Sequence, residues 1–236
     1  MNKIKYIIIL LASVGSLVSC ELDNIDGPDA GLYGSIIDDV SGALIEQDII
    51  RGGELELREF GYDNVSPQFM NYLVDGTFRD SKLFANTYKV FPLKTNFHTI
   101  DTMVVNISGQ TKLDLVVSPY VRIKNAEITM TDNIITATFS LEQTGDGNVV
   151  KVGLYAGADA NVGEPVRLVK KEQGIDAPVA PFNPIETYTL SINAGNEQDL
   201  VEGKPYFFRI GAVYDAPNAR YNYAPAVEFM LEITED

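Results

Sequence analysis

The sequence predicts an all-β protein made of two consecutive antiparallel β-sandwiches. From residue 30 onward, short runs rich in Val, Ile, Thr, Tyr and Phe are interrupted at short intervals by Gly, Asn, Asp and Pro. No stretch of residues 30–236 carries a long apolar stripe with the period of a helix. The chain has 236 residues, of which 45% are hydrophobic, enough for one or two domains with a buried core.

The first predicted sandwich spans residues 31–118. Residues 32–37 have the composition of a strand, and residues 38–42 that of a turn. Residues 54–58 alternate charged side chains with Leu, so one face of this strand should be buried and the other wet. Further strands are expected at 87–91, 103–107 and 113–117.

Two turns of this block carry strong local signals. Asp75-Gly76 is a turn dipeptide, and the turn at Ser108-Gly109 should join the two strands that close the block. Three apolar residues follow the first turn and are expected in the core, namely Phe78, Leu83 and Phe84.

The second predicted sandwich spans residues 119–236. It follows a short boundary at Ser118-Pro119-Tyr120, which favours a fixed angle between the domains. Along residues 206–214, alternation should turn Tyr206 and Phe208 toward the core and Arg209 toward solvent. The strands expected here, as many as in an immunoglobulin-type sandwich, lie around 121–129, 134–141, 149–156, 166–171, 186–192, 206–214 and 225–233.

The N-terminus predicts export and attachment to a membrane. Residues 1–19 place two Lys before an apolar run that is shorter than the about 20 residues needed to span a bilayer, which is typical of a secretory signal peptide. Cys20, the only cysteine, follows directly. Its thiol can accept a lipid and has no partner for a disulfide. Residues 20–30 are acidic and contain Gly and Pro, and are expected to form a flexible tether.

The composition argues against several classes of function. A net charge of −15 argues against nucleic-acid binding, because phosphates need Lys and Arg. One Cys and one His leave no Cys-based zinc site and no multi-His metal site, and no cofactor is expected. His98 is the single candidate base, and no Gly-x-Ser-x-Gly motif accompanies it. We therefore expect an exposed loop histidine and no enzymatic activity.

The abundant carboxylates are interpreted as a soluble acidic surface. Asp38 and Asp39 fall in a predicted turn, and Glu54 and Glu56 fall on one wet strand face. Residues 144–148 offer oxygen atoms for calcium, but their composition first predicts a hairpin turn.

The strongest candidate binding group lies in the loop between the last two predicted strands. Tyr rings can stack on the apolar face of a sugar, while carboxylate, amide and guanidinium groups can bind its hydroxyls, and loops at the end of a sandwich often bind ligands. The group consists of Asp215, Asn218, Arg220, Tyr221 and Tyr223. The alternative is ordinary hairpin chemistry, with both Tyr side chains packed at the start of the strand.

Three short motifs resemble bacterial processing signals. Leu17-Val18-Ser19-Cys20 resembles a lipobox, which implies that Cys20 is lipidated and begins the mature chain. The acidic run that follows resembles the surface-export signal of Bacteroidetes lipoproteins, which implies an outer-membrane location facing the cell surface, with the periplasmic leaflet as the alternative. Asp101-Thr102-Met103 resembles the O-glycosylation sequon of that phylum, which implies modification of Thr102.

Two longer motifs resemble known sandwich families. Gly34-x-Ile36-x-Asp38, with Gly42 after it, resembles the opening of carboxypeptidase-regulatory, transthyretin-like domains. Residues 200–213 resemble strand F of fibronectin type III domains, which implies a corner tyrosine whose hydroxyl bonds the backbone near Leu200. The corner residue is Tyr206, and Phe139 stands where such domains often carry Trp.

Residues 75–88 resemble a segment of a Bacteroidetes outer-membrane lipoprotein family of unknown function, in which a transthyretin-like domain precedes a fibronectin-like one. This resemblance implies association with polysaccharide-utilisation systems, beside a porin-type transporter and its lipoprotein partner. The expected function is a non-enzymatic glycan-binding or accessory module. The alternative is a structural spacer that docks onto outer-membrane transport complexes.

Overall fold

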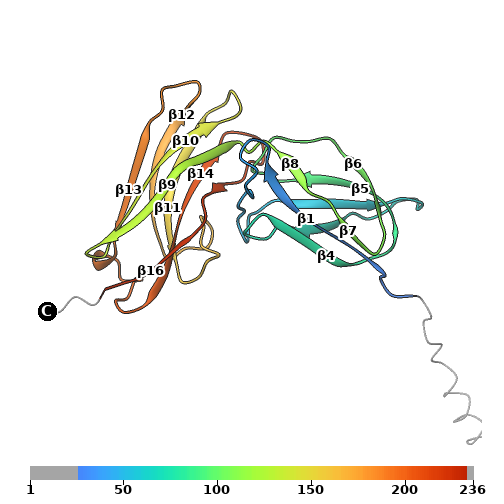
Figure 1. Cartoon of the computed structure of the whole chain (residues 1–236), viewed down its shortest axis with the longest axis horizontal. Coiled ribbons are helices and arrows are strands. Elements are labelled where there is room, and N and C mark those ends of the chain that lie inside the picture. The colour runs from blue at the N-terminus through green and yellow to red at the C-terminus, as the bar shows by residue number, and fades with distance from the viewer. Residues whose placement is uncertain (1–25, 233–236) are drawn as a thin grey trace, which may run out of the picture.

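The computed structural model describes residues 26–232 and confirms an all-β chain with two domains in series (Figure 1). In that part of the chain, the one helical element is a 3₁₀ turn at Ala194–Asn196. No helix among these residues is long and apolar enough to span a bilayer. The predicted signal peptide and Cys20 lie outside the described residues.

The first domain packs two sheets face to face. One has β1 (Ala30–Asp38) at its centre, flanked by β4 (Thr77–Leu83), β7 (Gln110–Lys112) and β8 (Leu115–Val117). The other has the order β3 (Gln68–Asn71), β2 (Glu54–Glu59), β5 (Asn86–Leu93) and β6 (Met103–Ile107).

The first sandwich departs from prediction at the Ser108-Gly109 turn. This turn leads from β6 in one sheet to β7 in the other, so it does not close a hairpin. As a result, β7 and β8 run parallel to β1, whereas the remaining strand pairs of this domain are antiparallel. A Cβ atom at Gly34 would lie 1.7 Å from the carbonyl oxygen of Leu113, which explains the glycine in β1.

The predicted core of this domain is largely confirmed. Phe78 and Leu83 are buried, as are Leu55 and Leu57 of the alternating strand β2. The prediction for Phe84 was wrong, because β4 ends at Leu83 and the next side chain points outward into solvent.

The second domain is a sandwich of two further sheets. Strands β9 (Val121–Thr131), β10 (Ile134–Gln143) and β13 (Thr187–Asn193) form one, in the order β13-β10-β9. The other is β12 (Val169–Ala177), β11 (Val149–Gly157) and β14 (Pro205–Tyr214), with β15 (Asn222–Tyr223) and β16 (Val227–Met230) both paired to β14. The last predicted strand, 225–233, corresponds to β16, and β15 precedes it as a separate short strand. Residues 144–148 connect β10 to β11 across the sheets and are not the hairpin turn that was predicted.

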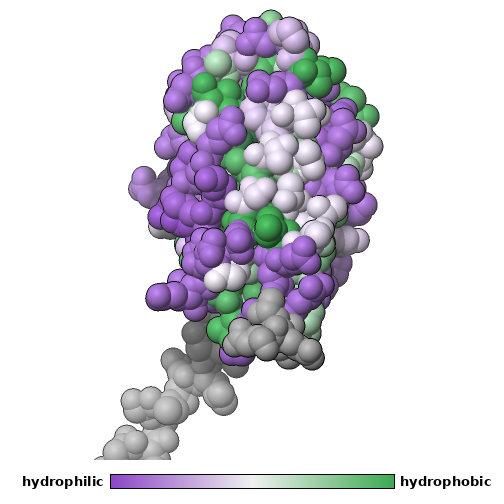
Figure 2. Space-filling view, turned by 90° about the vertical axis from the view of Figure 1, so that its left-hand side faces the viewer, coloured by the Kyte–Doolittle hydropathy of each residue, from purple (hydrophilic) through white to green (hydrophobic). Residues whose placement is uncertain are grey.

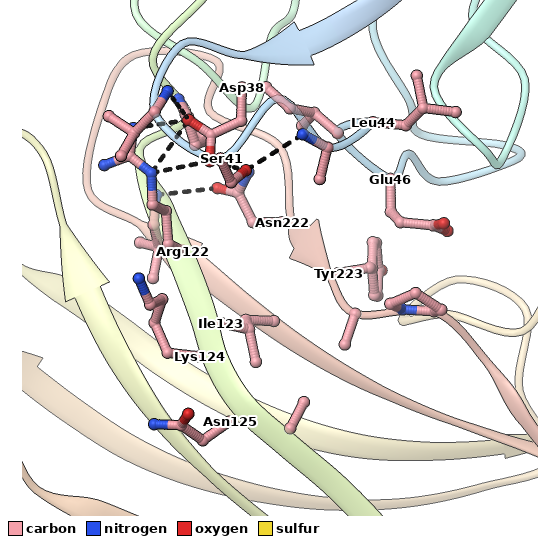
Figure 3. A pocket seen from close by; sticks show the side chains of 18 residues that line it. Asp38, Ser41, Leu44, Glu46, Arg122, Ile123, Lys124, Asn125, Asn222 and Tyr223 are labelled. Carbon is pink, nitrogen blue, oxygen red and sulfur yellow. Dashed lines mark hydrogen bonds and ion pairs between the residues drawn. The ribbon is translucent and has the colours of Figure 1, made fainter.

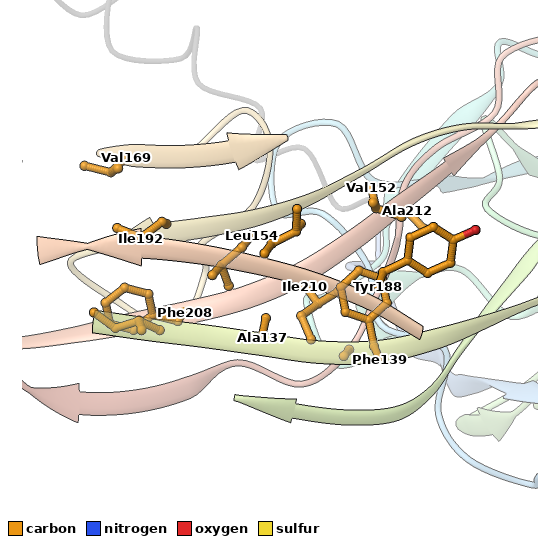
Figure 4. Packing of buried hydrophobic residues seen from close by; sticks show 14 of the residues in the cluster. Ala137, Phe139, Val152, Leu154, Val169, Tyr188, Ile192, Phe208, Ile210 and Ala212 are labelled. Atoms are coloured by element: carbon orange, nitrogen blue, oxygen red, sulfur yellow. The ribbon is translucent and has the colours of Figure 1, made fainter. Parts of the chain in front are cut away.

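The core of the second domain follows the predicted alternation (Figure 4). Phe139 is buried and stacks on Tyr188, with ring centroids 5.7 Å apart. The hydroxyl of Tyr206 accepts a hydrogen bond from the Val201 N–H at 2.9 Å, which confirms the predicted corner contact. Leu154 and Ile210, from neighbouring strands, fill the space between the sheets.

The end of the molecule on which β13 lies carries exposed hydroxyl side chains. The Oγ1 of Thr136 on β10 lies 3.1 Å from the Oγ of Ser191 on β13, and Thr187 and Thr189 are also exposed on β13. Seen from this side, a pale band of intermediate hydropathy runs between hydrophilic flanks (Figure 2). Threonine-rich strands are typical of a half-exposed sheet.

Candidate binding surfaces

The two domains meet through a buried polar network centred on Arg209. The prediction that Arg209 faces solvent was wrong, since its exposed fraction is 0%. Alternation along β14 does turn the side chain away from the core of its own domain, but the first domain covers that face of the sheet. The guanidinium donates to four carbonyl oxygens, those of Gln47 at 3.0 Å, Ala224 at 3.0 Å, Val162 at 3.2 Å and Val74 at 3.5 Å. It also pairs with the carboxylate of Glu46.

Asn96 joins the domains at a second point. Its amide nitrogen donates to the carbonyl oxygens of Glu46 at 2.9 Å and Tyr221 at 3.1 Å, and its amide oxygen accepts from the Gln47 amide at 2.9 Å. The Asn222 amide of the second domain donates to the Asn96 carbonyl at 2.9 Å. Buried polar groups satisfied in this way hold two surfaces in one register. This supports the fixed interdomain angle expected from the short boundary.

Asp38 forms a third contact across the boundary. It was predicted in a surface turn, but it is buried at the end of β1. Arg122 donates to its two carboxylate oxygens, Nη2 at 2.7 Å and Nε at 2.9 Å, and the Ser41 hydroxyl donates at 2.7 Å. Burial alone would raise the pKa of the Asp38 carboxyl, but hydrogen bonds from Arg122, Ser41 and the Val40 N–H together hold that pKa well below its usual range.

The predicted binding group at residues 215–223 lies beside this boundary. Asp215 and Asn218 are exposed, and the half-buried Arg220 donates its backbone N–H to the Thr95 carbonyl at 3.0 Å. Tyr221 and Tyr223 stack with ring centroids 5.6 Å apart.

Tyr223 is turned toward the first domain. Only 7% of it is exposed, and its hydroxyl donates to the Asp48 carboxylate at 2.9 Å. The ring also lies 4.3 Å from the Arg209 guanidinium carbon. The packing alternative therefore describes Tyr223, whose ring offers no open face to a sugar.

A groove of about 380 Å³ runs along the boundary (Figure 3). Leu44 and Glu46 face it from the first domain, while Ile123 and Asn125 of β9 face it from the second. Asn125 has φ 52° at a β-bulge in β9, an irregularity that often marks ligand sites. However, most polar side chains of the groove already have partners: Arg122 binds Asp38, and Glu46 binds Arg209. Few hydrogen-bonding groups remain for a ligand.

A second surface, on the first domain, differs from the groove because it has exposed aromatic rings and polar groups without partners among the described residues. The outer face of β3, β2 and β5, together with the loop after β2, carries four aromatic side chains, which we call the aromatic face: Phe60, Tyr62, Phe69 and Phe91. Tyr62 is 67% exposed, Phe69 54% and Phe60 40%. Phe69 and Phe91 flank Glu56 from either side, because both are its register partners on neighbouring strands.

Two adjoining hollows cut into the aromatic face. The larger, of about 360 Å³, is lined by the loop residues Phe60, Tyr62 and Asn64 among others. The smaller, of about 200 Å³, is lined by Glu56, Phe91 and Thr102. Arg58 and Lys89 line both hollows and so connect them. The result is an elongated depression with aromatic walls.

The charged groups of the aromatic face are only partly paired. Arg58 contacts the Glu56 carboxylate through Nε, and the Lys89 ammonium lies 5.6 Å from the centre of the Phe60 ring. Within residues 26–232, no ion pair involves Lys89. Aromatic rings beside unpaired hydrogen-bond donors are a combination suited to a sugar, which presents apolar C–H faces and hydroxyl edges.

The remaining predicted residues fall into two places. Thr102, the predicted glycosylation residue, is exposed at the rim of the smaller hollow. His98 was predicted in an exposed loop, but it is half-buried at the domain boundary, with Nε2 2.7 Å from the Thr144 hydroxyl and its ring edge-on to Tyr120. Burial lowers the pKa of His98. No group of three or more potential metal-ligating side chains occurs among the described residues.

Sequence reasoning missed the aromatic face. The signal was present in the pair of aromatic residues on either side of Gly61, directly after the alternating strand. Phe91 was predicted to lie in a strand, and its position on the outer face follows from its pairing with Glu56. Phe91 lies on the same side of the sheet as Glu56 and Arg58, the solvent-facing residues of β2.

Comparisons with known proteins agree with this architecture. Residues 30–118 match the N-terminal domain of the DUF3823 family, described as a protein of unknown function, and residues 121–228 match its C-terminal domain. No curated protein matches the chain.

Three crystal structures are similar over most of their length. A candidate carbohydrate-binding protein of Bacteroides uniformis is 33% identical, with a TM-score of 0.76, covering 87% of this chain and 100% of that one. A DUF3823 protein of Parabacteroides merdae is 22% identical, with a TM-score of 0.73 and coverage of 86% and 99%. One of Bacteroides ovatus is 23% identical, with a TM-score of 0.72 and coverage of 86% and 100%. The chain belongs to the DUF3823 family.

Proposed function

We propose that this protein is a non-enzymatic glycan-binding module of the cell envelope and that the aromatic face is its binding surface. The observation that carries the proposal is the elongated depression between Tyr62, which is exposed, and Phe91, which is half-buried, where these rings lie beside charged side chains without full partners. The relative from Bacteroides uniformis, itself a candidate carbohydrate-binding protein, supports the same ligand class.

The shape of the depression favours a chain of sugars over a single one. Two hollows joined at Arg58 and Lys89 offer successive positions along the sheet, and both are open to solvent at the surface. A ring in each hollow, Tyr62 in one and Phe91 in the other, can contact the apolar face of one sugar unit. The charged side chains between them can fix the orientation of the glycan.

The proposed location of the protein rests on its N-terminal sequence. We propose that Cys20 carries a lipid and holds the protein on the outer membrane, facing the cell surface, where it acts beside a porin-type transporter and its lipoprotein partner. In the structure, the chain enters β1 at Ala30, and Asp29 accepts a hydrogen bond from the Ala85 N–H at 2.8 Å. Cys20 precedes Ala30 by ten residues, a span of at most about 36 Å when extended.

Affinity electrophoresis tests the proposal. The purified protein should be retarded in native gels that contain one or more polysaccharides of a broad panel. Tyr62→Ala and Phe91→Ala should each reduce the retardation, because each removes a stacking ring. Tyr33→Ala is the matched control, since Tyr33 is an exposed tyrosine on β1 in the other sheet.

The outcomes separate the proposal from its alternative. No retardation by any polysaccharide would remove glycan binding and favour a spacer that docks onto transport complexes. Retardation that persists in Tyr62→Ala and Phe91→Ala but is lost in Tyr221→Ala would move the binding surface to the loop at residues 215–223. Thermal melting of each variant shows whether the fold is intact.

A further inference from the structure

We infer that the glycan is anionic and that a uronic-acid carboxylate binds between Arg58 and Lys89. This inference rests on the proposed function and specifies its ligand class. Its starting point is an unusual pair of charges. Arg58 on β2 and Lys89 on β5 are direct register partners on neighbouring strands, so two cations stand side by side on one face.

Such a pair carries an electrostatic cost. Like charges directly opposite each other on a sheet are destabilising. The chain contains 18 Lys and Arg against 33 Asp and Glu, so most bases could be placed beside an acid. A pair of adjacent cations at the junction of two hollows is the arrangement that a bound anion would stabilise.

The neighbouring carboxylates do not fully neutralise the pair. Glu56 contacts Arg58 only through Nε, and neither terminal nitrogen of that guanidinium makes a hydrogen bond within the described part of the chain. Glu59 lines the larger hollow, but its carboxylate accepts from the Asn86 amide at 2.7 Å. Lys89 has no ion pair among residues 26–232, and its ammonium lies over the neutral Phe60 ring.

The free donors of Arg58 and Lys89 are cationic and lie side by side, which suits the binding of a carboxylate. The two terminal nitrogens of a guanidinium form a planar fork that binds two carboxylate oxygens at once, and an ammonium adds a third donor. Tyr62 and Phe91 lie on either side of this pair, in the two hollows. A sugar ring could stack on either aromatic side chain while its carboxylate reaches the cations. A neutral glycan would leave both cations without a counter-charge.

Paired polysaccharides test the inference directly. Affinity electrophoresis would compare polygalacturonate, alginate and hyaluronan, each with its own methyl-esterified form, so that the backbone stays the same and only the charge is removed. Neutral polysaccharides complete the panel, and poly-glutamate supplies carboxylates without sugars. We expect at least one polyuronate to bind, with its ester weakened by about tenfold or more.

Two variants and a control locate the anion. Arg58→Gln and Lys89→Gln should each weaken binding of the same polyuronate by about tenfold. Lys82→Gln should leave binding unchanged, because Lys82 is an exposed lysine on β4 in the other sheet. Melting temperatures of all three variants check that the fold is retained.

The possible results distinguish this inference from the proposed function. Binding of a neutral glycan only, lost in Tyr62→Ala and unaffected by Lys89→Gln, would overturn the anionic ligand and leave glycan binding intact. Equal binding of a polyuronate and its methyl ester would also overturn the anionic ligand and leave glycan binding intact. Equal binding of poly-glutamate and polyuronate would also overturn it, since that is generic attraction of charge. Failure of every glycan would remove both proposals.

Discussion

The domain boundary and the aromatic face contain the same types of side chain but use them in opposite ways. At the boundary, Arg209 lies against the Tyr223 ring and its guanidinium has five partners. On the aromatic face, Lys89 lies over the Phe60 ring and has no carboxylate partner among the described residues. At the boundary, the hydrogen-bonding groups have partners within the protein, and these contacts join the two domains. On the aromatic face, hydrogen-bond donors have no partner within the described residues and are available to a ligand.

This difference shows that residue type alone does not mark a binding site. The loop at residues 215–223 has the composition of a sugar site, yet much of its chemistry is used in holding the domains together. Within the described residues, what distinguishes the aromatic face is that its unpaired donors lie near exposed rings, whereas the unpaired polar atoms of the loop, Arg220 Nε and the Tyr221 hydroxyl, are buried.

Arg209→Ala should have the largest effect. It leaves the Glu46 carboxylate without its partner and three carbonyl oxygens without a donor, so the free energy of unfolding should fall by about 3–5 kcal/mol. Urea denaturation followed by circular dichroism should also resolve two transitions, one for each domain. Lys204→Ala, at an exposed lysine just before β14, is the control. A single unshifted transition would show that the network does not couple the domains.

Arg122→Gln should have the next largest effect, about 2 kcal/mol at neutral pH, because it removes charged hydrogen bonds to Asp38. The pKa of Asp38 is lowered by folding, so this contribution is complete above the unfolded pKa of about 3.9 and is lost as pH falls through the folded value. Denaturation across acidic pH should show this loss in the natural protein and a flatter profile in Arg122→Gln. Identical profiles would argue against the ion pair.

Tyr223→Phe should have a smaller effect. It removes a hydroxyl that donates to Asp48 and accepts from the Glu164 N–H, both at 2.9 Å, and should cost about 1–2 kcal/mol. Glycan retardation in native gels should not change, because this ring belongs to the boundary. A variant with full stability and weaker glycan binding would reverse the roles that we assign to the two regions.

Lys89→Gln should have the smallest effect on stability and it should be favourable. It relieves the repulsion from Arg58 across the strand pair, worth about 0.2–0.5 kcal/mol, and so should slightly raise the melting temperature in calorimetry. Lys82→Gln provides the baseline. A clear loss of stability would mean that Lys89 has a structural role and would weaken the case for an open cation.

The fold was largely predictable because strands are encoded locally. Alternation in residues 54–58, the turn at Asp75-Gly76 and the corner tyrosine Tyr206 each depend on neighbours in sequence, and the structure places them as expected. The parallel pairing of β1 with β7 depends on which sheet the chain enters after a turn, and no local pattern specifies that.

The candidate site was less predictable for a related reason. The sequence shows that Arg209 points out of its own sandwich, but whether solvent or another domain lies there depends on residues 46–48, far earlier in the chain. Likewise, the proximity of Arg58 to Lys89 follows only from the register of β2 against β5. A pattern of exposure within one strand could not reveal either relationship.

The polar network at Arg209 also has a consequence for the order of synthesis. Residues 30–118 are made first, and they present the carboxylates of Glu46 and Asp48 where the second domain will later sit. Until the ribosome has added residues 209–223, these groups have no cation or hydroxyl to meet them. The first domain therefore lacks these interdomain contacts until residues 209–223 have been synthesised.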